Sequence, residues 1–368
     1  MAAQVEEQVL NLRAQADHNP SFVLKKPLEL GFEERPVPVI TDPRDVKIQV
    51  KKTGICGSDV HFWQHGRIGD YVVEKPMVLG HESSGVVVEV GSEVTSLKVG
   101  DRVAMEPGVP DRRSKEYKMG RYHLCPHVRF AACPPTDGTL CKYYTLPEDF
   151  CVKLPENVDF EEGALVEPLS VAVHTARLLG IYPGSKVVVF GAGPIGQLCI
   201  GVCKAFGASI IGAVDLFEQK LETAKEFGAS HTYVPQKGDS HDETAHKILE
   251  LLPNKQAPDV VIDASGAEQS INAGIELLER GGTFGQVAMG RTDYIQFAVS
   301  RMAMKEIRFQ GVFRYTYGDY ELATQLIGDG KIPVKKLVTH RRPFEKAEEA
   351  YELVKSGVAV KCIIDGPE

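Results

Sequence analysis

The chain has 368 residues, of which 43% are hydrophobic and 25% are charged, and its formal net charge is −8 at pH 7. A chain of this length exceeds the usual size of one hydrophobic core, so we expect two domains. The acidic balance argues against a nucleic-acid partner, because phosphate binding needs clustered lysine and arginine. No apolar run approaches a membrane span of roughly 18 residues. The first twenty residues lack the basic start and apolar middle of a secretory signal. The sequence therefore predicts a cytoplasmic protein that does not enter a membrane.

The cysteines do not suggest a disulfide framework. Eight are spread over the whole chain, at positions 56, 125, 133, 141, 151, 199, 203 and 362. A long chain without a signal pattern and with so few cysteines is expected to keep them reduced. Cys199 and Cys203 lie four apart in an apolar helical pattern and are interpreted as part of a buried helix face.

Residues 20–165 alternate short β-type runs with Gly and Pro, as in "DVKIQVKKTG" (45–54) and "GDRVAMEPG" (100–108). This pattern predicts an irregular β module. From about residue 167 the sequence pattern changes, and residues 185–208 predict an apolar strand, a glycine turn and an amphipathic helix. Strands and helices then alternate as far as 313. Such alternation predicts a parallel, doubly wound α/β sheet.

After residue 313 the sequence predicts a helix (319–330), a strand (335–344), a second helix (344–357) and a terminal strand (360–365). This tail is too small for a domain of its own, so we expect it to fold back onto the first domain. The predicted domains are therefore 1–166 together with 314–368, and 167–313.

The segment "VVVFGAGPIG" places Gly191, Gly193 and Gly196 between a β-branched strand and a helix. The first glycine allows a tight turn, the second lets a pyrophosphate approach the backbone, and the third lets helix and strand pack closely. Asp215 ends the next strand, 19 residues after Gly196, where it would accept hydrogen bonds from ribose hydroxyls. No arginine follows at 216–220 to neutralise a 2′-phosphate, so the pattern favours NAD over NADP.

Four residues are candidates for a metal site. Cys56 in "TGICGSDVH", His81 and Glu82 in "GHESSG", and Glu167 in "ALVEPLSV" offer one thiolate, one imidazole and two carboxylates. A catalytic zinc uses about three protein ligands and keeps one position open. Residue types alone leave the alternatives open, since a single cysteine is often inert and a Gly-His-Glu run is often a turn with a solvated acid.

Taken together, several motifs resemble the zinc-containing medium-chain alcohol dehydrogenases. "GHESSGVVVEVGSEV" matches their G-H-E-x2-G-x5-G-x2-V signature, and it occurs with "GICGSDVH", "GALVEPLSV", "GAGPIG" and "GVFRY". The resemblance covers roughly residues 20–368, is strongest to the polyol branch of sorbitol and xylitol dehydrogenases, and is closest to the fungal xylitol dehydrogenases. It implies a GroES-like β-rich catalytic domain, a Rossmann coenzyme domain and, as is common in this branch, a homotetramer.

The resemblance also implies roles for individual residues. Cys56, His81 and Glu82 match zinc-binding positions, and Glu167 matches an acid that reaches the metal directly or through water. Ser58 and His61 match positions that relay a proton, and Phe62, Arg314 and Tyr315 match polyol contacts together with Glu167. Phe62 stands where mammalian sorbitol dehydrogenases have a tyrosine, so this chain lacks the hydroxyl at that position. The implied cofactor contacts are Gly191, Gly193, Pro194, Ile195, Gly196, Asp215, Lys220, Val287, Ala288, Met289, Phe313 and Arg314.

The implied reaction is the oxidation of a secondary alcohol. One zinc per subunit acidifies the alcohol, and hydride passes to the nicotinamide of NAD. The leading substrate is xylitol, giving D-xylulose, and L-arabinitol and sorbitol are alternatives within the same class. A non-catalytic nucleotide-binding protein and a zinc-free quinone reductase are alternatives from other classes. Both would be expected to lack the metal set at Cys56, His81 and Glu82.

A second, structural zinc is not expected. Many relatives bind it through four cysteines spaced C-x2-C-x2-C-x7-C, whereas Asp111, Ser114 and Tyr117 take the first three of those places here and only Cys125 remains. Serine and tyrosine are poor zinc ligands, and one thiolate cannot complete a tetrahedral site.

Overall fold

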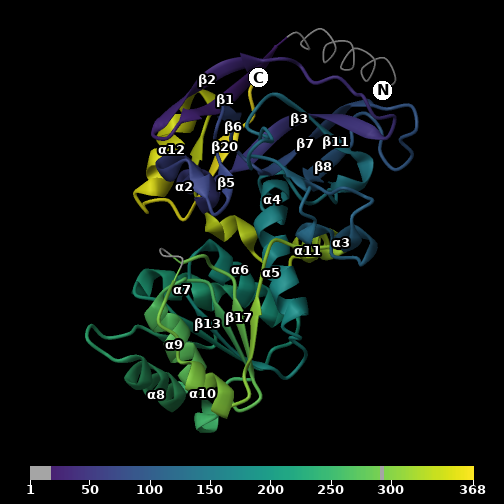
Figure 1. The fold of residues 1–368 in the computed structure, drawn as a ribbon. Coiled ribbons are helices and arrows are strands. Elements are labelled where there is room, and N and C mark those ends of the chain that lie inside the picture. The colour runs from purple at the N-terminus through teal and green to yellow at the C-terminus, as the bar shows by residue number, and fades with distance from the viewer. Residues whose placement is uncertain (1–17, 291–293) are drawn as a thin grey trace. The chain divides into compact units, whose positions relative to one another are not determined.

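The computed structural model describes residues 18–290 and 294–368, and the chain divides into two compact units (Figure 1). Unit 1 comprises the described residues up to Glu167 together with Leu337–Glu368, and unit 2 is Pro168–Lys336. The second boundary therefore follows Lys336, whereas the sequence placed it before residue 314. Most of the N-terminal stretch inspected for a signal lies outside the described residues.

Unit 1 is built mainly of antiparallel strands. Its largest sheet has the order β12-β8-β7-β3-β20-β19, and β11 also pairs with β3. The bounds are β3 Asp45–Gly54, β7 Glu82–Val90, β8 Arg102–Met105, β11 Tyr143–Pro147, β12 Cys151–Lys153, β19 Val338–Arg342 and β20 Lys361–Asp365. Smaller sheets have the orders β2-β1-β6, β10-β9 and β4-β5. Their bounds are β1 Asn19–Lys26, β2 Glu29–Arg35, β4 Arg67–Ile68, β5 Tyr71–Val72, β6 Met77–Val78, β9 Gly108–Val109 and β10 Arg129–Phe130.

The large sheet of unit 1 holds a core of β-branched side chains. Val46, Ile48 and Val50 on β3 are at most 1% exposed and pack with Val87 and Val103 from the neighbouring strands. Each such side chain contributes about 1.5–3 kcal/mol by leaving water. Ile363 on β20 pairs with Gly54 on β3, so the last strand of the chain lies beside the end of β3.

Unit 1 contains helices between these strands. They are α2 Gly57–His65, α3 Lys115–Lys118, α4 Phe160–Ala164 and α12 Ala347–Lys355. The chain passes into unit 2 within α5, Val166–Leu178. Helix α2 follows β3 directly and is the element that brings the first metal candidate into place.

Unit 2 confirms the predicted doubly wound parallel sheet. Its strands have the order β15-β14-β13-β16-β17-β18, and each neighbouring pair is parallel. The bounds are β13 Lys186–Phe190, β14 Ile210–Val214, β15 His231–Tyr233, β16 Val260–Asp263, β17 Thr283–Gln286 and β18 Arg308–Gly311. The order reverses between β13 and β16, which is the crevice where a Rossmann sheet binds its ligand.

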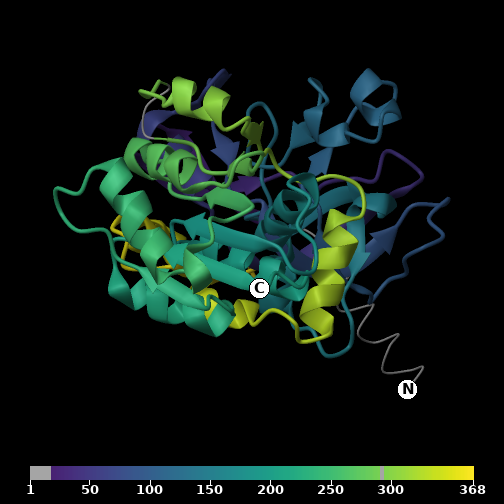
Figure 2. The same ribbon diagram turned by 90° about the horizontal axis from the view of Figure 1, so that it is seen from below.

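Helices lie on both faces of this sheet (Figures 1 and 2). They are α6 Pro194–Ala205, α7 Glu218–Phe227, α8 His241–Leu251, α9 Glu268–Leu277, α10 Val299–Met304 and α11 Asp319–Gly328. One set of right-handed crossovers runs from β13 through β14 to β15, and the other runs from β16 through β17 to β18. Because the two sets run in opposite directions across the sheet, α6 and α7 lie on one face and α9 and α10 on the other. Val188, Phe190, Val261, Ile275 and Phe284 form part of the core between sheet and helices. Within the described part of the chain, no helix is both long and apolar enough to cross a membrane.

Candidate active site

Cys56 lies at the junction of β3 and α2, as the N-cap residue of that helix. The helix is held at this point by Asp59, whose Oδ2 lies 3.4 Å from the backbone nitrogen of Cys56. Asp59 is fully buried. The cysteine is therefore fixed on a helix terminus between two rigid elements.

His81 and Glu82 reach the same place from the neighbouring strand. His81 follows Gly80, whose φ of +86° turns the chain, and Glu82 is the first residue of β7. Glu82 pairs with Gly54 across the sheet. A Cβ atom at position 54 would lie 2.3 Å from Oε2 of Glu82, so only glycine leaves room for the carboxylate there.

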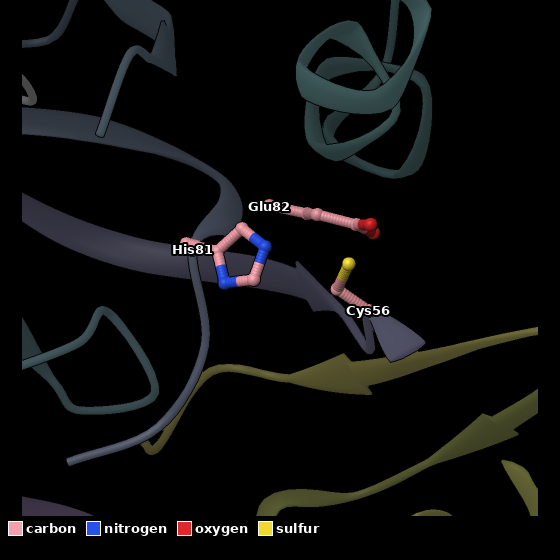
Figure 3. A group of neighbouring side chains, drawn as sticks. All are labelled: Cys56, His81 and Glu82. Atoms are coloured by element: carbon pink, nitrogen blue, oxygen red, sulfur yellow. The ribbon is translucent and has the colours of Figure 1, made fainter. Parts of the chain in front are cut away.

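The ligand atoms of Cys56, His81 and Glu82 all lie within 4.8 Å of one another, the one cluster of this kind found among the described residues. Figure 3 shows the thiol pointing toward the carboxylate, with a ring nitrogen of His81 facing both. His81 and Glu82 are 5% and 1% exposed, and Cys56 is half-buried. Residues 25 positions apart in the sequence thus form a mostly buried donor set of mixed type.

Asp59 orients the imidazole of this cluster. Its Oδ1 lies 3.2 Å from Nδ1 of His81, which leaves Nε2 as the nitrogen for a metal. Burial lowers the pKa of His81, but Asp59 and Cys56 outweigh it and hold that pKa well above the ordinary histidine value. A carboxylate behind a ligating histidine is a common feature of zinc sites. The donor set and its support therefore fit a zinc ion.

Glu82 has a further partner, Lys361, which the sequence analysis did not identify. The Lys361 Nζ atom lies 2.7 Å from both carboxylate oxygens and donates to the Ile55 carbonyl at 3.1 Å. Lys361 is 4% exposed. Burial lowers its pKa, but Glu82, Cys56 and Glu167 together raise it above the ordinary lysine value. The lysine comes from β20, more than 270 residues from Glu82, and no local pattern marks it.

The fourth metal candidate, Glu167, is 6% exposed in the first turn of α5. It does not belong to the cluster within 4.8 Å that the described residues form. Its charge nonetheless acts on Lys361, which places it in the same electrostatic environment. The cluster itself therefore supplies three donors, as an open catalytic zinc site requires.

The two relay candidates and one substrate candidate lie on α2. Ser58 is half-buried in its first turn, Phe62 is 3% exposed, and His61 is exposed on the outer side. Nδ1 of His61 lies 3.0 Å from the carbonyl of Arg67, and its ring centre lies 4.6 Å from that of His65. Ser58 and His61 are thus carried by the helix that Cys56 begins.

The remaining substrate candidates follow β18 in unit 2. Arg314 has a φ of +53°, and its guanidinium carbon lies 4.7 Å from the centre of the Phe313 ring. Tyr315 is 2% exposed, and its ring meets that of Tyr320 edge-on at 5.3 Å. Phe313 is 46% exposed. The segment therefore combines an exposed aromatic ring, a strained arginine and a buried tyrosine.

The glycine turn between β13 and α6 has the geometry of a phosphate cradle. Gly191 has a φ of +89°, and a Cβ at Gly196 would lie 1.8 Å from the Gly191 carbonyl oxygen. A Cβ at Gly193 would meet nothing within 4 Å, so this glycine faces open space at the N-terminus of α6. Pro194 and Ile195 begin the helix, whose free N–H groups attract a phosphate. The turn fits a dinucleotide.

Asp215 follows β14 and is bound to the backbone by both oxygens. Oδ2 accepts the N–H of Ala192 at 2.7 Å, and Oδ1 accepts that of Phe217 at 3.0 Å. The acid is thereby fixed beside the glycine turn. Lys220 lies on α7 nearby, with Nζ 4.9 Å from the centre of the Phe217 ring.

The other edge of the crevice is organised by Asp263, the last residue of β16. Its carbonyl accepts the N–H groups of Val287 and Ala288 at 2.9 and 3.1 Å. Its buried carboxylate accepts bonds from Ser265, Gly266 and Gln286, although burial raises its pKa. One residue thus fixes the loop that carries three predicted cofactor contacts, of which Met289 is 70% exposed.

The segment that keeps only one of the four cysteines is held by other contacts. The Tyr122 hydroxyl donates to Glu106, Arg112 pairs with Asp149 at 2.6 Å, and Ser114 accepts the Tyr117 N–H to cap α3. The Tyr122 ring meets that of Phe150 edge-on at 5.8 Å. Asp111 accepts the Arg113 N–H, and Cys125 is buried. Hydrogen bonds and an aromatic contact connect this segment to the β sheet.

Two family models match the chain. Residues 42–156 match the alcohol dehydrogenase GroES-like domain, and residues 194–329 match the zinc-binding dehydrogenase domain. The first match contains the Cys56 cluster and the second contains the helix of the glycine turn and Asp215.

Related proteins match nearly the whole length of the chain. The chain is 53% identical over 348 residues to a D-xylulose reductase A of Aspergillus niger, covering 95% of this chain and 97% of that protein. It is 55% identical to a protein of Aspergillus clavatus named "Probable D-xylulose reductase A", with the same coverage.

Solved structures of dehydrogenases also match nearly the whole chain. An Escherichia coli oxidoreductase/dehydrogenase of unknown specificity, described as involved in membrane biogenesis, matches with a TM-score of 0.88 and 32% identity over 95% of this chain and 100% of that chain. A protein of Sinorhizobium meliloti described as a "putative zinc-binding dehydrogenase", solved with NADP, matches with a TM-score of 0.85 and 25% identity over 95% and 99% of the two chains.

Proposed function

The chain belongs to the zinc-binding dehydrogenases with a GroES-like domain, and on that premise we propose that it oxidises xylitol to D-xylulose with NAD+ as hydride acceptor. Membership in this family makes it an oxidoreductase that uses zinc and a nicotinamide cofactor. The choice of xylitol rests on the relatives named D-xylulose reductase, and the choice of NAD rests on Asp215.

The observation that carries the proposal is the cluster of Cys56, His81 and Glu82, with ligand atoms within 4.8 Å and Asp59 behind the histidine. These three residues would hold one zinc ion. When bound, zinc supplies Lewis acidity that lowers the pKa of an alcohol at its open position. Glu167 would add a second carboxylate that reaches the metal directly or through water.

Ser58 and His61 move the proton. Ser58 Oγ accepts the proton that the substrate hydroxyl releases and passes its own toward solvent. The exposed imidazole of His61, on the same helix, then receives a proton at Nε2, because its Nδ1 is engaged with the Arg67 carbonyl. The burial of the two residues supports this order, because Ser58 is half-buried and His61, one turn later on α2, is exposed.

Arg314 and Tyr315 contact the distal hydroxyl groups of the polyol, and Phe62 contributes an apolar wall. A guanidinium offers several N–H donors in a fixed plane, which suits a chain of hydroxyl oxygens. Phe62 cannot donate a hydrogen bond, so recognition depends more strongly on Arg314 than in a site with tyrosine at that position.

The glycine turn, Lys220 and the segment Val287–Met289, together with Phe313, bind the cofactor. Asp215 selects NAD because its fixed carboxylate would face and repel a 2′-phosphate. In wild-type protein the catalytic efficiency with NAD+ should exceed that with NADP+ by at least about a hundredfold.

We further propose a homotetramer in the cytoplasm, with one zinc per subunit, no structural zinc, and no nucleic-acid or membrane partner. The net charge of −8 supports the absence of nucleic-acid binding. The substitutions at Asp111, Ser114 and Tyr117 support a single zinc. Light scattering on purified protein and zinc analysis by atomic emission test these statements.

The activity is tested by following NADH formation from xylitol, L-arabinitol and sorbitol at equal concentrations, with identification of the ketose product. Xylitol should give the highest kcat/KM, with D-xylulose as product. A preference for L-arabinitol or sorbitol would reassign the substrate within the class, and no oxidation of any polyol by zinc-loaded protein would refute the proposed function.

A further inference from the structure

Asp319 is a buried carboxylate in unit 2 that has no role in the reaction proposed for this chain. It is the first residue of α11, and its side chain is 0% exposed. It accepts hydrogen bonds from Nδ1 of His174 at 2.9 Å, from Nη1 of Arg177 at 2.6 Å and from the backbone N–H of Thr316 at 2.7 Å. Because a carboxylate only accepts hydrogen bonds, Nδ1 of His174 carries its proton here.

The three donors come from two separate parts of unit 2. His174 and Arg177 lie one turn apart on α5, so both face α11, which lies beside it (Figure 1). Thr316 belongs to the turn before α11, and Arg177 also donates to the carbonyl of Tyr317 in that turn at 3.3 Å. Asp319 therefore ties the turn to helix α5.

The turn held in this way directly follows Arg314. Arg314 has a φ of +53°, a left-handed conformation that residues other than glycine disfavour. Upstream, the N–H of Val312 bonds to the Gln286 carbonyl at 2.9 Å and fixes the end of β18. Downstream, the contacts of Asp319 fix Thr316. Arg314 is strained between two fixed points, and a strained residue persists only when its surroundings hold it.

We propose that Asp319 is a positioning residue that, with His174 and Arg177, holds Arg314 in the conformation that recognises the polyol. The proposal rests on the substrate role proposed above for Arg314. Removing the carboxylate frees the turn, so the guanidinium no longer meets the distal hydroxyl groups in one geometry. The defect should therefore fall on KM for the polyol, with kcat little changed.

The test is a double-mutant cycle of Asp319→Ala and Arg314→Met, with KM and kcat for xylitol as the readout and circular dichroism as the check on folding. Each single variant should raise KM about tenfold and change kcat less than threefold. In the Arg314→Met background, Asp319→Ala should raise KM no further, because two residues that act as one unit are non-additive.

Two companion variants keep the cycle interpretable. Asp319→Asn retains the shape and one acceptor oxygen, so it should raise KM by about threefold and serves if the alanine variant does not fold. Thr324→Val removes the bond from Thr324 Oγ1 to the Tyr320 carbonyl in the same helix. It should lower the thermal midpoint while leaving KM unchanged.

The outcomes separate the two proposals. If Arg314→Met leaves KM unchanged, the substrate role of Arg314 fails and the positioning role fails with it. If Arg314→Met raises KM but Asp319→Ala and Asp319→Asn do not, only the positioning role is overturned. Fully additive effects on KM would also overturn it.

Discussion

The two units build their sites from different parts of the chain. In unit 1 the site consists of side chains: a thiol, an imidazole and a carboxylate, supported by Asp59 and Lys361. In unit 2 it consists mainly of backbone: a glycine turn with one acid fixed beside it. A side-chain donor is lost when its residue is replaced by one without the donor group. A backbone turn has no such group to delete and is disrupted when one of its glycines is replaced by a residue with a side chain.

This difference explains the buried charge around the metal candidates. A zinc site gathers ionisable groups, so unit 1 buries Asp59, His81, Glu82 and Lys361 together. Buried charges are tolerated because each is paired, and removing one partner costs more than the pair contributes. The nucleotide turn needs no such compensation, because N–H groups at a helix N-terminus already attract phosphate.

The largest effect should come from Cys56→Ala, which removes one of three metal donors while leaving unit 2 intact. We expect xylitol turnover to fall at least about a thousandfold, or about 4 kcal/mol, and zinc content to fall well below one per subunit. NADH affinity, measured by fluorescence, should change less than about twofold. Parallel loss of NADH binding would contradict the independence of the two sites.

Lys361→Met tests whether the ion pair in unit 1 competes with the metal. Without zinc, Glu82 would be buried and unpaired, so the free energy of unfolding should fall by about 3 kcal/mol. With zinc bound, the metal takes over the charge and the loss should be smaller. The increase in thermal midpoint on adding zinc should therefore be larger in the variant than in wild type.

Lys361→Arg is the matched control, because it keeps the charge. Weaker zinc binding by Lys361→Met, measured by competition with a chelator, would contradict the account. It would mean that the lysine holds Glu82 in position for the metal instead of competing with it.

Asp215→Ser removes the acid that is fixed beside the glycine turn of the nucleotide site. The ratio of kcat/KM with NAD+ to that with NADP+ should fall about thirtyfold, or about 2 kcal/mol, because the ribose acceptor and the repulsion of a 2′-phosphate are both lost. Zinc content should stay at the wild-type value. An unchanged ratio would show that another residue sets cofactor choice.

Glu148 offers a buried carboxylate in unit 1 without a metal neighbour. It accepts bonds from Ser96 Oγ and N–H and from the Thr95 N–H at 2.6–2.9 Å, which lower its pKa. A lowered folded-state pKa stabilises the protein above the unfolded pKa, and this stability is lost as the pH falls through the folded pKa.

Glu148→Gln should therefore cost about 1 kcal/mol of unfolding free energy near pH 7. The difference from wild type should shrink below about pH 4.5, near the ordinary glutamate pKa. Urea unfolding at pH 7 and pH 4 measures both values, and a difference independent of pH would contradict the assignment.

Strong local patterns predicted most of the fold. The strand Asp45–Gly54, the parallel sheet and the helices α6, α11 and α12 all follow from periodicity and from glycine and proline punctuation. Helix α2 was missed because its nine residues carry a weak amphipathic pattern within a region of short strands. Helix α8 was also not identified, although Ser240 and Glu243 form a capping box before it.

The site could be predicted only in part, for a physical reason. Cys56, His81 and Glu82 lie in short recognisable motifs, so sequence resemblance identified them together. Lys361 joins Glu82 through strand pairing between distant segments, which leaves no local pattern. Asp59 lies three residues after Cys56 at a helix start, so an N-capping pattern was the signal that could have identified it.

The most direct test of the central account is a zinc titration of chelator-treated protein, with xylitol-dependent NADH formation and bound zinc measured at each step. The account predicts no activity in the zinc-free protein, a linear rise on addition of zinc, and saturation at one zinc per subunit. Activity that persists without zinc, or that saturates only at two zinc ions per subunit, would contradict the single catalytic centre at Cys56, His81 and Glu82.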